Sequence, residues 1–129
     1  MISHHAALIY TMVLVAASDR EMTDAEMRRM GEIIRNLPVF ADYSAELLPN
    51  TASACAELLD ETDGLDKTLE LIESALPAKL RETAYALACD VAAADGRVRE
   101  EEVRMLELIR HGLEIERLAA AAIERGARA

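Results

Sequence analysis

The sequence predicts an all-α fold, a single bundle of about seven helices formed by one domain over residues 1–129. Its composition favours helices, because alanine and leucine are abundant while proline (3) and glycine (5) are scarce. Hydrophobic residues make up 52% of the chain, enough to close one core, whereas aromatic residues make up only 3%, which argues against a β-sandwich or barrel. A helix–turn–helix pattern also occurs twice, as expected for a bundle with an internal pseudo-twofold repeat.

Two helices are expected in the first third of the chain. Ser3 caps a helix that runs to about residue 17 and is apolar on nearly every side, as is typical of a helix at the centre of a domain. Thr23 and Glu26 form a capping box that opens a second helix, and Pro38 ends it. The stripe that this second helix should bury consists of Met27, Met30, Ile34 and Leu37.

The rest of the chain continues in the same way, with helical stripes separated by turn signals. The Asp63-Gly64 and Asp95-Gly96 pairs mark turns, Pro77 suits the first turn of a helix, and Gly112 ends one. We expect a short helix around residues 44–48 and longer ones over about residues 51–61, 65–76, 77–94, 99–111 and 115–125. The helix over 99–111 should bury Val103, Leu106 and Ile109.

The helix–turn–helix pattern repeats with a shift of 76 residues, which places residues 9–37 on residues 85–113. Eight of the 29 aligned positions are identical: Val15/Val91, Ala16/Ala92, Ala17/Ala93, Asp19/Asp95, Glu26/Glu102, Arg28/Arg104, Ile33/Ile109 and Leu37/Leu113. Each unit is a buried helix, an acidic turn and a capped amphipathic helix. The repeat therefore predicts two helical hairpins that pack about a local pseudo-twofold axis.

The repeated acids define a candidate metal site. Carboxylates are the ligands that Ca²⁺, Mg²⁺ and Mn²⁺ prefer, so Asp19, Glu26, Asp95 and Glu102 would form a divalent-cation site if the two turns lie together. One turn alone would bind poorly, because Val91 and Ala93 occupy the first two ligand positions of the corresponding EF-hand loop. The alternative is that these acids only cap helices and complement their dipoles.

The segment from Ala92 to Glu102, with its weaker copy from Ala16 to Glu26, resembles the TerB family of tellurite-resistance proteins. The order of helices fits over nearly the whole chain. The resemblance implies an all-α fold with internal pseudo-symmetry and a cytoplasmic, non-enzymatic module linked to tellurite resistance and stress responses. It also implies an acidic surface proposed to bind metal, which falls on Asp19, Glu26, Asp95 and Glu102, and a role in docking protein partners.

Two residues depart from the symmetry of the repeat. Arg20 stands where the second unit has Gly96, so that it could neutralise Asp19, and Arg99 stands where Thr23 caps the helix of the first unit. Arg20 would thereby weaken the first half of the candidate metal site.

Other function classes are disfavoured. The net charge of −10 would repel nucleic-acid phosphates and anionic lipid. The apolar run from Ala6 to Ala17 is too short to span a bilayer and lacks the basic segment of a signal peptide. Cys55 and Cys89 fit buried, reduced thiols.

The three histidines, His4, His5 and His111, fit surface or capping positions. No phosphate-binding loop or nucleophile motif is present. Two alternatives stay open: a structural interaction domain with an apolar groove near residues 39–48, and an enzyme that uses paired carboxylates as acid and base.

Overall fold

The computed structural model describes residues 2–18 and 22–128. These residues form seven α-helices and two short 3-10 turns, and they contain no strand. The elements are α1 (His4–Ala16), α2 (Asp24–Asn36), η1 (Pro38–Phe40), η2 (Ala45–Leu47), α3 (Leu48–Leu59), α4 (Gly64–Ala75), α5 (Ala78–Ala92), α6 (Glu100–Gly112) and α7 (Arg117–Arg128). The all-α prediction is confirmed, whereas the pseudo-twofold relation of the two hairpins stays a prediction.

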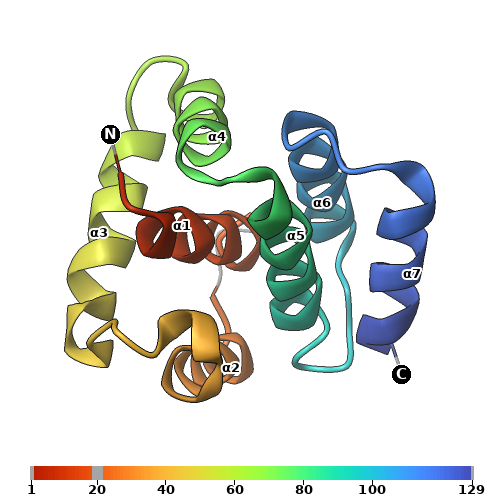
Figure 1. Ribbon diagram of the computed structural model, residues 1–129, viewed down its shortest axis with the longest axis horizontal. Helices are drawn as coiled ribbons and strands as arrows, with labels where there is room; N and C mark the ends of the chain where they lie inside the picture. The colour runs from red at the N-terminus through yellow and green to blue at the C-terminus, as the bar shows by residue number, and fades with distance from the viewer. Residues whose placement is uncertain (1, 19–21, 129) are drawn as a thin grey trace.

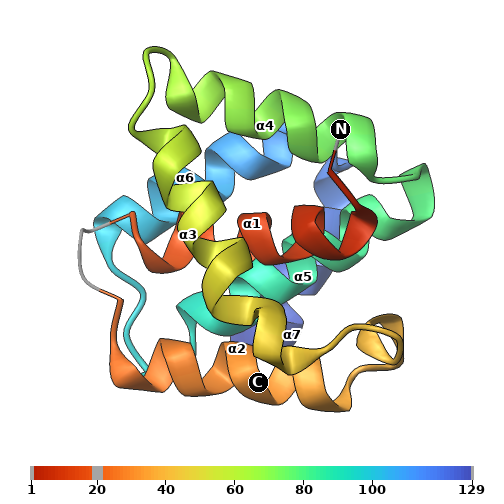
Figure 2. The same ribbon diagram turned by 90° about the vertical axis from the view of Figure 1, so that its left-hand side faces the viewer.

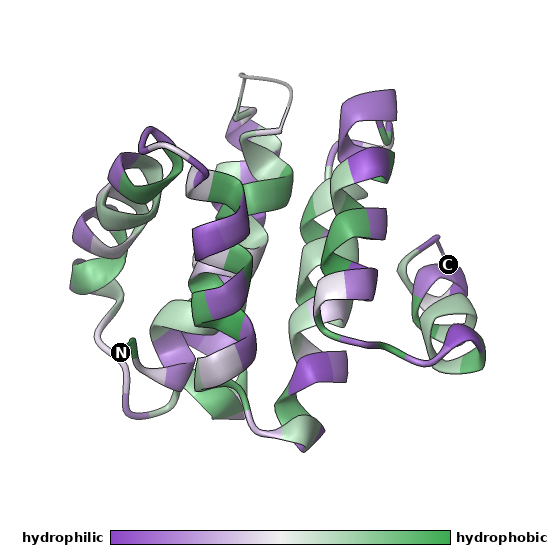
Figure 3. Cartoon of the chain, turned by 90° about the horizontal axis from the view of Figure 1, so that it is seen from above, coloured by the Kyte–Doolittle hydropathy of each residue, from purple (hydrophilic) through white to green (hydrophobic). Residues whose placement is uncertain are grey.

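Helix α1 lies at the centre of the bundle, as its sequence predicts. Eleven of its residues, from His5 through Ala16 with the exception of Ala6, are buried. It packs against α3, α4, α5 and α6, while α5 also contacts α2 and α7 (Figures 1 and 2). Around this pair, each outer helix carries both hydrophilic and hydrophobic residues (Figure 3). A fully apolar helix is stable here because neighbours cover it on every side.

Helix boundaries follow the capping signals closely where such signals exist. The Ser3 hydroxyl accepts the Ala6 N–H at 3.1 Å and starts α1, and the Thr23 hydroxyl starts α2 in the same way. The predictions are less accurate where the signal is weak. Helix α3 begins at Leu48, earlier than expected, with a proline in its first turn, and α7 is shifted toward the C-terminus.

The buried stripes of α2 and α6 differ from the predicted ones. Met27 and Val103 were expected to be buried, yet they are 51% and 44% exposed. The reason is that the preceding residues, Glu26 and Glu102, occupy the inward-facing position and are both fully buried. A residue one place further along a helix points about 100° away, toward solvent.

The expectation that every histidine lies at the surface is wrong for His5. This side chain is 8% exposed, and its Nε2 lies 2.9 Å from the Val39 carbonyl oxygen and 3.1 Å from Asp42 Oδ1. Its ring also lies against Phe40 and Tyr43. His5 thus fastens the η1 region to the start of α1.

Cys55 and Cys89 are buried and form no disulfide in the part of the chain that the structure describes, in agreement with the prediction. Burial raises the pKa of the Cys55 thiol to about 12 and that of the Cys89 thiol to about 11. Among the described helices, none combines the length and the apolar character needed to cross a membrane.

Candidate functional site

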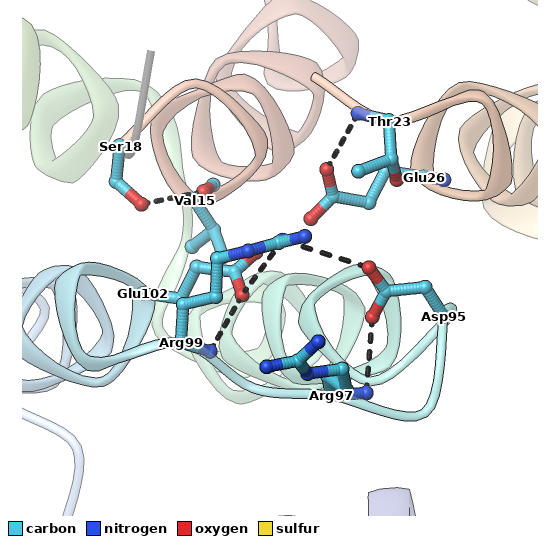
Figure 4. Close-up of polar contacts among 8 residues, drawn as sticks. All are labelled: Val15, Ser18, Thr23, Glu26, Asp95, Arg97, Arg99 and Glu102. Atoms are coloured by element: carbon cyan, nitrogen blue, oxygen red, sulfur yellow. Dashed lines mark hydrogen bonds and ion pairs between the residues drawn. The ribbon is translucent and has the colours of Figure 1, made fainter. Parts of the chain in front are cut away.

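Three of the four predicted acidic residues belong to one region of the molecule, and Asp19 lies outside the described residues. Glu26 is in the first turn of α2, Asp95 is in the connection between α5 and α6, and Glu102 is in the first turn of α6. Figure 4 shows their side chains pointing into a shared space together with Arg99. We call this space, bounded by Glu26, Asp95, Arg99 and Glu102, the junction.

Glu26 closes the capping box of α2 from inside the protein. Its Oε1 accepts the backbone N–H of Thr23 at 2.9 Å, while the Thr23 hydroxyl accepts the N–H of Glu26 at 3.1 Å. The side chain is fully buried, and its Oε2 has no hydrogen-bond partner among the described residues. A buried oxygen normally finds a donor, so this one has unused capacity for a ligand.

Glu102 holds the same position in the second unit, but its helix cap is different. Its Oε1 accepts the backbone N–H of Arg99 at 2.9 Å, and the side chain is fully buried. Arginine has no acceptor atom, so Arg99 does not return the hydrogen bond that Thr23 supplies in the first unit. Instead, Arg99 Nη1 lies 3.9 Å from Glu102 Oε1.

Asp95 is bound from two sides. Its Oδ1 accepts the backbone N–H of Arg97 at 3.0 Å, and its Oδ2 lies 3.5 Å from Arg99 Nη1. The turn between these residues requires a φ of 79° at Gly96, a value that glycine adopts without strain. The Arg99 guanidinium therefore links the carboxylate of this turn to the carboxylate of the following helix.

An ion pair beside the junction ties α2 to α5. Arg29 Nε donates to Asp90 Oδ2 at 3.0 Å, one helical turn beyond Glu26. This hydrogen bond raises the pKa of Arg29 above its ordinary value. Because both side chains are more than a third exposed, we expect the pair to add little stability. The ion pair nevertheless joins the first half of α2 to the end of α5, beside the junction.

Comparison with known proteins identifies the family. The family model described as tellurite resistance protein TerB matches residues 5–125. The chain belongs to the TerB family. No curated protein and no solved structure shows significant similarity to it. Membership in TerB accounts for the helical fold and confirms the resemblance carried by the two acidic segments.

The donor types in this TerB junction fit a hard divalent cation, because all of them are carboxylate oxygens. Their present spacing does not. Across residues 2–18 and 22–128, no three Asp, Glu, His or Cys side chains converge closely enough to hold a metal ion. The ion-pair distances of Arg99 give a physical reason, since a guanidinium group lies between Asp95 and Glu102.

The TerB domain also contains a pocket that the sequence analysis did not predict. It has a volume of about 290 Å³ and lies between α5, α6 and α7. Tyr85 donates a 2.5 Å hydrogen bond to Glu124 at its polar end, beside Cys89, and Val98 and Val103 line its apolar side. Tyr85 and Glu124 are separated by 39 positions in the sequence, which explains why no local motif indicated this pocket.

Proposed function

We propose that this chain is a non-enzymatic, cytoplasmic TerB module of a tellurite-resistance or stress-response system. Its acidic junction takes up a divalent cation, Ca²⁺, Mg²⁺ or Mn²⁺, and the acidic face around it docks partner proteins. The family match over residues 5–125 supports the module and its association with tellurite resistance. The cation and the partner are proposed from the chemistry of the junction.

One observation carries the cation proposal. Glu26 Oε2 is buried, and no described residue donates a hydrogen bond to it. A buried carboxylate oxygen without a donor is costly unless something else satisfies it, and a cation does so most effectively. Asp19, the predicted fourth ligand, precedes this helix in the sequence and would complete the set.

The charge of the junction supports the same conclusion. Among the described residues that bound it, three carboxylates face a single guanidinium, which leaves a formal charge of −2. A divalent cation has the opposite charge of equal size. An acidic surface with such a cation can also bind acidic groups of a partner through the metal, which a purely anionic surface would repel.

Calorimetric titration with Mn²⁺ tests the proposal, with Ca²⁺ and Mg²⁺ as competitors. We expect saturable binding at micromolar to millimolar concentrations, as for other carboxylate sites. Asp95→Asn should weaken binding at least tenfold, because it removes a ligand charge while preserving the turn. The matched control is Glu101→Gln, an exposed acid of the same helix turn, which should change binding much less.

A second candidate function is a plain interaction scaffold in which the acids only cap helices. The hydrogen bonds that Glu26 and Glu102 accept from the backbone N–H groups of Thr23 and Arg99 favour it, since both are capping contacts. In that case wild-type protein would bind no cation at millimolar concentration. Asp95→Asn would then leave partner binding unchanged.

A further inference from the structure

We propose that the pocket between α5, α6 and α7 binds a small organic cation, an ammonium group on an apolar body, and that Glu124 recognises its charge. The inference does not depend on the proposed uptake of a divalent cation, because none of the residues that bound the junction lines this pocket. It would give the domain a small-molecule ligand at a second, separate place.

The pocket results from the way in which the last three helices pack. Helices α6 and α7 both pack on α5, whereas they make almost no contact with each other (Figure 1). Buried side chains of α5, among them Tyr85 and Cys89, form the base of the pocket, and residues of α6 and α7 form its sides. A hollow of about 290 Å³ remains between the helices. A ligand can occupy it without displacing the core around α1.

The walls of the pocket are mainly apolar and partly open to solvent. Ala92 and Leu106 line it together with Val98 and Val103, which are both 44% exposed. A ligand that covered these valines would remove apolar surface from water, which favours binding. A cavity of about 150 Å³ holds benzene, so this pocket has room for roughly a dozen non-hydrogen atoms. That size fits one ring with a short chain and excludes a nucleotide.

Glu124 supplies an acceptor at the polar end of the pocket. Its Oε2 accepts the hydroxyl of the buried Tyr85 at 2.5 Å, while its Oε1 accepts no hydrogen bond from the part of the chain that the structure describes. Burial and this hydrogen bond raise the pKa of Tyr85, so the phenol keeps its proton and remains the donor. The carboxylate is therefore held in one orientation with one oxygen available to a ligand.

The charges around the pocket favour a cationic ligand over an anionic one. Two carboxylates, of Glu107 and Glu124, and one guanidinium, of Arg128, line it, which leaves a formal charge of −1. Within residues 2–18 and 22–128, no ion pair joins Glu124 to a basic side chain. The net charge of −10 on the whole chain attracts cations as well. An ammonium group could donate to Glu124 Oε1 while its apolar body lies between α6 and α7.

The experiment is an NMR titration of the isotope-labelled full chain at neutral pH with three probes of similar size. Phenethylamine carries a positive charge, 2-phenylethanol is neutral, and 3-phenylpropanoate carries a negative charge. Phenethylamine should bind with a Kd of roughly 0.1–1 mM, as expected for so small a ligand, and should shift amide resonances of α5, α6 and α7 around the pocket. The alcohol should bind at least about threefold more weakly, and the carboxylate at least about tenfold.

Two variants test the site itself, each with a matched control. Glu124→Gln keeps an oxygen that can accept the Tyr85 hydroxyl, and it should lower the affinity for phenethylamine to about that for the alcohol. Glu101→Gln makes the same change of charge at an exposed acid outside the pocket and should bind like wild type. Val103→Phe should fill the pocket and weaken both ligands at least about fivefold, while Leu108→Phe, at a similarly exposed position of α6 outside the pocket, should not.

Each other outcome contradicts a part of the proposal. If none of the probes binds wild type at about 10 mM, the pocket is not a ligand site. Equal or tighter binding of the alcohol or the carboxylate would overturn the cationic class of the ligand. Binding that survives Val103→Phe, or shifts confined to other helices, would overturn the location, and this variant changes an exposed residue, so it stays informative even if Glu124→Gln fails to fold. If N-acetyl-lysine amide bound as tightly as phenethylamine, the occupant would be a side chain of a partner protein instead of a free ligand.

Discussion

The burial of Glu102 leads to a quantitative prediction about stability. Glu102→Ala removes the carboxylate that accepts the Arg99 backbone N–H at 2.9 Å and that lies 3.9 Å from Nη1 of the Arg99 guanidinium. Loss of a charged hydrogen bond costs about 1.5–3 kcal/mol, and truncation of a fully buried side chain adds the cost of the cavity that it leaves. Alanine recovers only a few tenths of a kcal/mol through its helix propensity.

We therefore expect Glu102→Ala to lower the free energy of unfolding by about 2–4 kcal/mol, which corresponds to a Tm lower by roughly 8–15 °C for a domain of this size. Glu102→Gln should lose about half as much or less, because its amide oxygen still accepts the Arg99 N–H. The assay is equilibrium unfolding in urea, followed by far-UV circular dichroism.

The control is Glu101→Ala, which changes the exposed neighbour in the same helical turn. It should cost less than about 0.5 kcal/mol, the usual limit for a surface site. If Glu102→Ala proved no more destabilising than Glu101→Ala, the carboxylate would not stabilise the start of α6. The interpretation of Glu102 as a buried anchor for the junction would then be wrong.

Three further predictions concern other parts of the fold. Thr23→Ala should destabilise the protein by about 1 kcal/mol in urea unfolding, because α2 loses the hydroxyl that accepts the Glu26 N–H. Val103→Ser should cost less than about 0.5 kcal/mol, whereas Ile109→Ala on the same helix should cost about 2–4 kcal/mol, since only Ile109 is buried. Burial raises the pKa of Cys55 from 9.0 to about 12, so the folded state retains this proton longer than the unfolded state. The contribution of this thiol to the free energy of unfolding should be fully present below pH 9.0 and should fall by up to about 1.4 kcal/mol per pH unit above it. Cys55→Ala should reduce that slope, as measured by urea unfolding at increasing pH.

The sequence predicts those parts of the fold whose signals are local. The capping box at Thr23 and Glu26 is present, and the all-apolar stretch of α1 lies at the centre of the bundle, as expected. Both signals involve residues within one or two helical turns. The predicted start of α3 was less accurate, because no side chain before Leu48 caps the helix.

The errors in the buried stripes of α2 and α6 have one cause. A search for periodic apolar residues assigns Met27 and Val103 to the interior and treats Glu26 and Glu102 as polar and exposed. The structure reverses both assignments, because each glutamate is bonded to the backbone of its own helix start and can enter the core. Only tertiary packing decides that a charged residue takes an interior position.

The candidate site was also predicted only in part from the sequence. The repeat alone indicates that Glu26, Asp95 and Glu102 belong to related turns, and the structure brings their side chains toward one space. The sequence also shows that Arg99 breaks the symmetry of the caps. It does not show that this guanidinium reaches Asp95 and Glu102 together, since that depends on how the turn at Gly96 bends.

The capping and ligand-binding interpretations of these acids are compatible. A carboxylate has two oxygens, and a capping box uses only one of them. In Glu26 that oxygen accepts the Thr23 N–H, which fixes the side chain in one orientation and directs the second oxygen into the junction. A cap that is fully buried thus orients a ligand atom in advance, at no additional cost in side-chain entropy when an ion arrives. Thr23→Ala removes the hydroxyl that caps α2 but keeps the backbone N–H that orients Glu26, so it should lower helix stability and leave cation binding nearly unchanged. Binding weakened as strongly as stability would show that the N–H alone does not hold the Glu26 side chain in place.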